Sequence, residues 1–230
     1  MKYKLLITTS WTWSRLWDLT KETNKGLIKL WWKEILAHII DTYPSDIDIV
    51  VALWYFWEKV KNFLIERYPM RNITYSYVDI YEWPWSSLGY SMLCTKEYLQ
   101  CPFIFHCNDT IVNTYMPSVS ENRAGWYKVT DSAQYTTFKT NGDNIILYNK
   151  VKWASDYDYA HIWLVWMYEY EKYWNILDSL YKENPNDSAL NDVKVLYEML
   201  HSWSHIGFIG FTKWLDTGNL EALDHAQKNI

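Results

Sequence analysis

The first half of the chain alternates short apolar runs with longer segments in which apolar residues recur at helical spacing. The apolar runs, rich in aliphatic and β-branched residues, lie at 4–9, 47–53, 73–78 and 102–106. Segments with helical spacing follow them at 27–40, around 60–64 and at 86–99. Strands that alternate with helices over short connections predict a parallel sheet with right-handed crossovers. The expected fold class is therefore α/β, with a Rossmann-like, doubly wound and mostly parallel sheet.

The second half of the chain has strand-like runs separated by polar turns. We expect strands at 134–139, 144–149, 159–168 and 206–214, and helices at 170–181, 189–200 and 220–227. No repeat, low-complexity tract or linker divides the 230 residues, so we expect one compact domain. Ligands of doubly wound sheets bind beyond the carboxyl ends of the strands. Here those ends precede the segments that begin at Ser10, Trp54, Asp79 and Cys107.

Charge and cysteine content exclude several partners and place the protein in a reducing compartment. The net charge is −5 and the sequence pI is about 5.7. Without a lysine- or arginine-rich block, the chain is a poor candidate for nucleic-acid binding. No apolar stretch approaches the ~18 residues of a membrane span, so we expect no membrane partner. Cys94, Cys101 and Cys107 lack metal-ligand spacing and are interpreted as reduced thiols of a cytoplasmic protein. These features leave open whether the protein forms a homo-oligomer.

Tryptophan is unusually frequent in this chain and glycine unusually rare. There are 16 Trp and 7 Gly, whereas an average glycine content of ~7% gives about 16. Many tryptophans stand at strand ends and turns, where glycine is favoured; the positions are 11, 13, 31, 32, 54, 57, 83, 85, 163 and 166. We interpret them as sites where tryptophan has replaced glycine. Overpacking costs ~1–3 kcal/mol per site, so impaired folding or activity is expected.

Four short motifs follow the predicted strands. The loop after the first strand is Ser10-Trp11-Thr12-Trp13-Ser14-Arg15-Leu16, which with glycine at 11 and 13 becomes Gly-x-Gly-Ser-Arg-Leu. Asn24-Lys25 lies downstream, Asn108-Asp109 follows the fourth strand, and Trp214-Leu215-Asp216-Thr217-Gly218 lies near the C-terminus. In this order, the motifs resemble those of the sugar-phosphate nucleotidyltransferase superfamily over nearly the whole chain.

The resemblance implies a role for each matched residue. Residues 1–115 correspond to the nucleotide-binding half and 116–230 to the acceptor-binding half. Nucleotide binding is expected at Ser10, Trp11, Thr12, Trp13, Ser14, Arg15, Lys25, Ser86, Ser87, Gly89 and Asp109. Asp109 and Asp216 would hold Mg²⁺, which prefers oxygen ligands and bridges phosphates. Arg15, Lys25 and Lys150 are the expected catalytic cations; Lys150 departs from the family's Glu-Lys-Pro, and Lys152 is its rival.

The implied activity is nucleotidyl transfer from an NTP to a sugar phosphate. Pyrophosphate would leave, and the resulting NDP-sugar would feed surface glycan synthesis such as capsule polysaccharide. A cytidylyltransferase for a small phosphorylated alcohol or amine, such as phosphocholine, is the main variant. An alternative of another class is a non-catalytic, Trp-rich carbohydrate-binding module. His161 and Tyr159 would face the acceptor pocket, but His161 is interpreted as structural.

Overall fold

The structure is a computed structural model that describes residues 2–9, 16–80, 86–149 and 154–230. Within them, the central sheet has nine strands, with β8 and β12 attached to the path β10-β9-β11-β6-β1-β4-β5. The strand bounds are β1 Lys4–Thr8, β4 Asp48–Leu53, β5 Ile73–Tyr77, β6 Phe103–Cys107, β8 Arg123–Tyr127, β9 Thr137–Asn141, β10 Asn144–Tyr148, β11 Tyr159–Met167 and β12 Gly207–Gly210. Strands β6, β1, β4 and β5 run parallel. The expected α/β class with a mostly parallel central sheet is confirmed.

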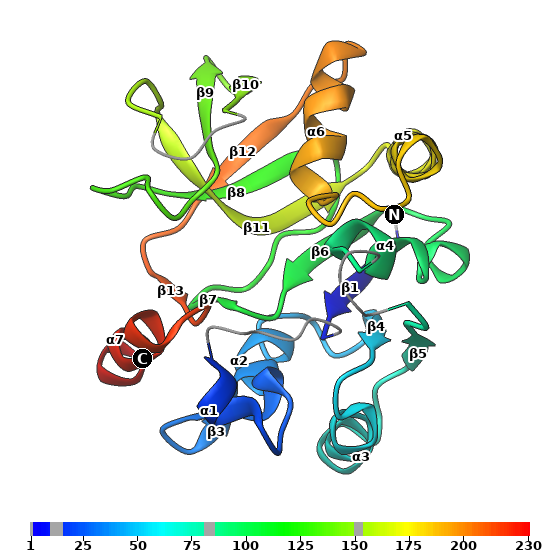
Figure 1. The fold of residues 1–230 in the computed structure, drawn as a ribbon, viewed down its shortest axis with the longest axis vertical. Coiled ribbons are helices and arrows are strands. Elements are labelled where there is room, and N and C mark those ends of the chain that lie inside the picture. The colour runs from blue at the N-terminus through cyan, green and yellow to red at the C-terminus, as the bar shows by residue number, and fades with distance from the viewer. Residues whose placement is uncertain (1, 10–15, 81–85, 150–153) are drawn as a thin grey trace.

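Helices cover both faces of this sheet (Figure 1). Their bounds are α1 Trp17–Thr20, α2 Ile35–Ile40, α3 Trp57–Arg67, α4 Leu88–Leu93, α5 Tyr170–Glu183, α6 Asp192–His201 and α7 Leu220–Asn229. Strand β1 shows why both faces need cover: Leu5 and Ile7 join the core under α2 and α3, whereas Leu6 joins the core under α4, α5 and α6. Because adjacent side chains of a strand point to opposite faces, a continuous apolar run is buried from both sides.

The segment 27–40 is not the single helix that its apolar spacing predicts. A two-stranded hairpin, β2 Lys29–Leu30 with β3 Lys33–Glu34, precedes the short helix α2. Trp31 in the turn of this hairpin has a φ of 59°, in the left-handed region that a right-handed helix cannot include. The short 3-10 helix η2, Lys25–Leu27, lies just before the hairpin.

Two further elements differ from the sequence prediction. The expected helix 86–99 is split into α4 and the 3-10 helix η3, Lys96–Tyr98. The expected strand 206–214 is two strands in different sheets, because β12 pairs with β8 whereas β13, Trp214–Asp216, pairs with β7, Thr110–Val112. The chain therefore crosses between sheets before the C-terminal motif, and that crossing brings Asp216 to the end of β6.

Backbone geometry distinguishes two kinds of tryptophan. Among the described non-glycine residues, φ is positive at Trp31 (59°), Phe56 (51°), Trp163 (54°) and Trp203 (66°). Three of these four are tryptophan, and the left-handed region favours glycine. Trp166, in contrast, is 1% exposed, and its Nε1 donates to the Pro117 carbonyl at 2.9 Å. Positive φ supports the glycine hypothesis at 31 and 163, whereas Trp166 occupies a site built for an indole.

Candidate active site

Lys25 is held at the carboxyl end of the parallel strands by its neighbour Asn24. The Asn24 Nδ2 donates to the carbonyls of Thr9 at 3.0 Å and Tyr55 at 2.7 Å, one following β1 and the other following β4. Its Oδ1 accepts from the Gly26 N–H at 2.9 Å and thereby caps η2. One buried amide thus ties two strand ends together and fixes the direction of the lysine beside it.

Lys25 forms a buried ion pair with Asp109. The Lys25 Nζ lies 3.5 Å from the Asp109 Oδ2, and the two side chains are 2% and 10% exposed. Asp109 follows β6, the strand next to β1 in the sheet. Its other oxygen, Oδ1, is buried and has no hydrogen-bond partner within the described parts of the chain. A buried carboxylate oxygen without a donor is costly, which makes it a candidate ligand atom.

Asp216 joins this pair through the small sheet formed by β7 and β13. In that sheet Asp216 lies opposite Thr110, and Thr217 donates to the Asp109 carbonyl through both its N–H at 2.9 Å and its Oγ1 at 3.2 Å. These bonds hold the backbones of the two motifs side by side. The two aspartates, 107 positions apart by their numbering (216 − 109), therefore reach one place.

The Asp216 carboxylate is strongly affected by its surroundings. Burial first, and then the negative charge of Asp109, raise its pKa to about 6. The Gly218 N–H donates to Oδ1 at 2.7 Å, and the Tyr135 hydroxyl donates to Oδ2 at 3.4 Å. Gly218 leaves room for this arrangement: an added Cβ would lie 2.9 Å from Oδ1, and the Asp216 carboxylate would have to shift. Two carboxylates that disfavour each other's charge create a site for a cation.

The donor set fits Mg²⁺ better than a soft metal. No cluster of three or more His, Cys, Asp or Glu side chains suited to a metal occurs in the described ranges. Mg²⁺ is commonly bound through one or two carboxylates, with waters and substrate phosphates completing its octahedron. Asp109 and Asp216 supply two such carboxylates, and the unpaired Oδ1 of Asp109 is one of their oxygens.

The expected base-binding segment has clear packing roles. The Ser87 Oγ accepts from the Tyr90 N–H at 3.0 Å and caps α4, and Ser86 is half-buried. The Gly89 N–H donates to the Leu190 carbonyl at 2.9 Å, and an added Cβ would lie 2.5 Å from the Leu190 Cγ. The remaining predicted residues lie outside the described ranges: Ser10, Trp11, Thr12, Trp13, Ser14, Arg15, Lys150 and Lys152.

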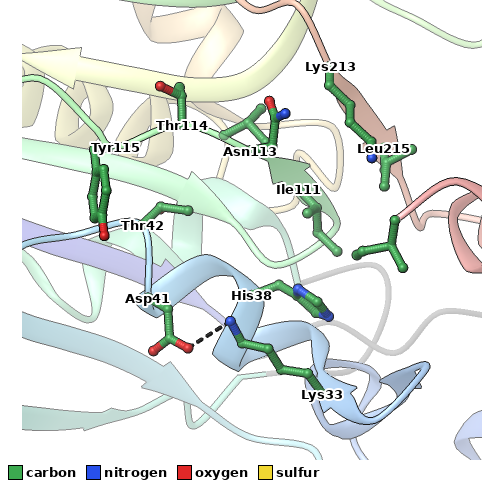
Figure 2. Close-up of a pocket in the computed structure, with 12 residues that line it drawn as sticks. Lys33, His38, Asp41, Thr42, Ile111, Asn113, Thr114, Tyr115, Lys213 and Leu215 are labelled. Atoms are coloured by element: carbon green, nitrogen blue, oxygen red, sulfur yellow. Dashed lines mark ion pairs between the residues drawn. The ribbon is translucent and has the colours of Figure 1, made fainter.

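Two cavities lie near the β7–β13 sheet. One, of about 530 Å³, is lined by Asp216 together with Tyr127, Tyr135 and Trp214. The other, of about 270 Å³, lies between α2, the segment after β7 and the C-terminal strand, with Lys33 and Lys213 on its walls (Figure 2). Only the first cavity includes one of the predicted metal ligands among its lining residues.

His161 forms a second buried pair, and it lines neither of the two cavities described above. Its Nε2 lies 3.0 Å from the Asp192 Oδ2, and both side chains are 0% exposed. The rings of Tyr148 and Trp163 pack against the imidazole, with centroids 5.7 and 5.8 Å away. This enclosure agrees with the structural interpretation of His161. Sequence reasoning missed Asp192 and also the supports Asn24, Thr217 and Tyr135.

Comparison with known proteins identifies the fold. No family signature and no curated sequence matches the chain. A solved structure assigned as a glucose-1-phosphate thymidylyltransferase from Bacillus anthracis matches with a TM-score of 0.79 at 17% identity, covering 98% of this chain and 94% of that one. The inositol-1-phosphate CTP transferase from T. maritima matches with a TM-score of 0.77 at 12% identity, covering 99% and 95%. CTP:phosphocholine cytidylyltransferase from Streptococcus pneumoniae matches with 0.76 at 14%, covering 99% of both chains.

These likenesses define the class to which the fold belongs. The chain shares its fold with these three nucleotidyltransferase structures, in agreement with the fold that the resemblance of its motifs implies. At such low identities the likeness establishes the fold and leaves substrate and residue roles to the site itself. In the ranges that the structure covers, no helix has both the length and the apolar character needed to cross a bilayer.

Proposed function

We propose that the chain transfers a nucleotidyl group from a nucleoside triphosphate to a phosphorylated small molecule. The observation that carries this proposal is the convergence of Lys25, Asp109 and Asp216 beside a cavity. A cation and two carboxylates are what a triphosphate with its metal ion requires. The shared fold adds support. This convergence favours an enzyme over a tryptophan-rich carbohydrate-binding module.

The reaction is a substitution at phosphorus that depends mainly on positioning and charge. An oxygen of the acceptor phosphate forms a bond to the α-phosphorus of the NTP. The bond from that phosphorus to the oxygen bridging the β-phosphate breaks, and pyrophosphate leaves with the electron pair. Lys25 binds the phosphate oxygens and offsets their charge. Sequence alone assigns Arg15 to the triphosphate and Lys150 to the acceptor phosphate.

Asp109 and Asp216 hold the metal ion in this proposal. An Mg²⁺ ion held there would supply positive charge to offset the negative charge that develops on the phosphates during transfer. The Lys25 ammonium prevents the two carboxylates from repelling the substrate. The motif resemblance assigns Ser86 and Ser87, just before α4, and Gly89, in its first turn, to the nucleotide side of the site.

The proposed acceptor is a sugar phosphate, and the product an NDP-sugar for surface glycans such as capsule polysaccharide. The solved structures with the same fold include enzymes named for glucose-1-phosphate, inositol-1-phosphate and phosphocholine. Phosphocholine is therefore the second candidate acceptor. Because NTPs and sugar phosphates are cytoplasmic metabolites, the proposal places the protein in the cytoplasm.

A pyrophosphate-release assay tests the proposal directly. Each of the four common NTPs is combined with a panel of sugar phosphates, inositol phosphate and phosphocholine, with and without Mg²⁺. The assay is run on this chain and on the Trp11→Gly/Trp13→Gly variant, because glycine lets a backbone approach phosphates closely. Metal-dependent release with one pair supports the proposal. Absence of release from both proteins with every pair would refute it.

A further inference from the structure

The cavity beside Asp216 has an aromatic wall. The Trp214 ring lies at its centre, with the Tyr127 ring centroid 5.6 Å away and the Tyr135 ring centroid 5.2 Å away. All three residues line the same cavity of about 530 Å³. Their ring planes are inclined to that of Trp214 by 54° and 69°, so the faces do not stack on one another. Trp214 is 9% exposed and belongs to the core, whereas Tyr127 and Tyr135 are half-buried, so the two tyrosine rings are the more accessible part of this wall.

The same cavity is rich in carboxylates. Asp131, Asp216 and Glu221 line it, against a single lysine, Lys128, and one histidine, His225. One of these carboxylates is joined to the aromatic wall, because the Tyr135 hydroxyl donates to the Asp216 Oδ2 at 3.4 Å. Aromatic faces and carboxylates in one cavity both attract a positive charge.

We propose that the acceptor is a small phosphorylated cation, an ammonium compound whose charged head lies in this cavity. The head packs against Tyr127, Tyr135 and Trp214 and is neutralised by Asp131 and Glu221. Its phosphate points toward Asp216 and Asp109, where it attacks the NTP as described above. This inference rests on the proposed function and, of its two candidate acceptors, favours the cationic one over the sugar phosphate.

The second cavity has the opposite character and serves as an internal contrast. Its charged lining residues are Lys33, Lys213, Asp41 and His38, and the Lys33 Nζ is paired with the Asp41 Oδ2 at 2.7 Å (Figure 2). One aromatic residue, Tyr115, is among the described residues on its walls, and neither Asp109 nor Asp216 is. A cationic head thus has a favourable site in the cavity that reaches Asp216, and a poor one in the other.

A charge-only comparison of acceptors tests the inference. Phosphocholine is compared with dimethylbutyl phosphate, an isostere whose head is uncharged because carbon replaces the ammonium nitrogen. Glucose-1-phosphate is the third acceptor. Both pyrophosphate release and calorimetric binding are measured, on this chain and on the Trp11→Gly/Trp13→Gly variant. We expect phosphocholine to exceed the isostere by at least about tenfold in kcat/KM and in affinity. An isostere or sugar phosphate that performs equally well overturns the inference.

Variants locate the effect in the cavity. Glu221→Gln and Asp131→Asn are expected to weaken phosphocholine at least about threefold each and to leave the isostere unchanged. Tyr127→Leu is also expected to weaken phosphocholine and leave the isostere unchanged. Tyr127→Phe keeps the aromatic ring and should keep the preference for phosphocholine over the isostere. Asp224→Asn, an exposed carboxylate on the same helix as Glu221 that pairs with Lys228, is the matched control and should change neither ligand. Equal loss for both ligands would contradict recognition of charge.

The two proposals fail in different ways. If no combination of NTP and acceptor releases pyrophosphate, the proposed function fails. The calorimetric binding measurement then tests by itself whether the cavity binds a cationic head. In that case at least about tenfold tighter binding of phosphocholine than of its isostere still supports a cation site. Equal binding, or none, overturns it. If a sugar phosphate is the sole productive acceptor, nucleotidyl transfer stands and the cationic acceptor is refuted.

Discussion

Two buried ion pairs of this protein differ in what surrounds them. Lys25 and Asp109 lie 3.5 Å apart at the carboxyl end of the sheet, and His161 and Asp192 lie 3.0 Å apart under α6. In each pair the aspartate keeps one buried oxygen, Oδ1, without a hydrogen-bond partner among the described residues. The unpaired oxygen therefore cannot by itself distinguish a ligand site from a structural pair.

Access and neighbouring charge make the distinction. Asp109 has a second carboxylate beside it, Asp216, which lines a cavity. The His161–Asp192 pair is fully enclosed, and the aromatic rings of Tyr148 and Trp163 pack around it. A buried pair costs desolvation free energy that only good geometry offsets. We infer that the first pair is retained for ligand binding and the second for the packing of α6 on β11.

The largest expected effect is loss of turnover when the two carboxylates proposed to bind the metal ion are changed. Asp109→Asn and Asp216→Asn should each lower kcat/KM at least about 10²–10³-fold, because several kcal/mol of charge stabilisation are lost. The free energy of unfolding should be unchanged or higher for Asp216→Asn, since one of two repelling charges is removed. It should be lower for Asp109→Asn, because the buried Lys25 ammonium loses its ion pair with this carboxylate. Pyrophosphate release and urea unfolding measure the two quantities. Full activity in either variant would remove that residue from the metal site.

The second pair should show the reverse pattern. Asp192→Ala leaves a buried histidine without its partner and should lower the free energy of unfolding by about 3–5 kcal/mol. The activity of the remaining folded fraction should be unchanged. The double variant His161→Phe/Asp192→Leu should recover much of the loss, because an apolar pair needs no desolvation. If Asp192→Ala instead keeps its stability and loses turnover, the assignment of the two pairs is wrong.

The sequence predicts the parts of this molecule that local pattern controls. Continuous apolar runs identify β1, β4, β5 and β6 because burial from both faces leaves no polar alternation. The prediction of one helix over 27–40 was wrong because the hairpin turn there depends on the positive φ of Trp31. An aromatic residue gives no sequence signal for a left-handed turn.

For the site, strand ends predicted where Asp109 would lie, and a motif marked Asp216. Their supports are non-local: Tyr135 reaches Asp216 across 81 positions, and His161 reaches Asp192 across 31. No periodicity encodes such contacts, because they arise when separate elements pack together. Asn24 could have been anticipated, since an Asn before a short helix favours capping, but its bond to Tyr55 could not.

The raised pKa of Asp216 makes the stability of the protein and its affinity for Mg²⁺ depend on pH. A folded pKa of about 6, above the ordinary value of 3.8, means that the folded protein binds this proton more tightly than the unfolded chain. The metal-free protein should therefore lose stability as pH rises from about 4 through about 6. Mg²⁺ affinity should fall about tenfold per pH unit below about 6, because the ion competes with the proton.

Calorimetric Mg²⁺ titrations and thermal melts between pH 4 and 8 measure both effects. Asp216→Asn should flatten the stability profile in this window. A wild-type profile that rises between pH 4 and 6 and is unaffected by Asp216→Asn would contradict the electrostatic coupling of Asp216 with Asp109.

The smallest expected effect concerns tryptophans whose backbone is in the left-handed region. It tests whether they, rather than either ion pair, limit the stability of the protein. Trp203 is the cleanest case, because it is 95% exposed and has a φ of 66°. Trp203→Gly should raise the free energy of unfolding by about 1 kcal/mol, since a side chain at this φ costs ~1–2 kcal/mol and glycine gives back part of that through its freer unfolded chain. Trp203→Ala keeps a Cβ at the same φ and should show no such gain. Urea unfolding of the three proteins measures the difference, and pyrophosphate release should be the same for all. Equal stability of the glycine and alanine variants would remove the backbone argument at this site, and with it the strongest physical support for glycine at Trp31 and Trp163.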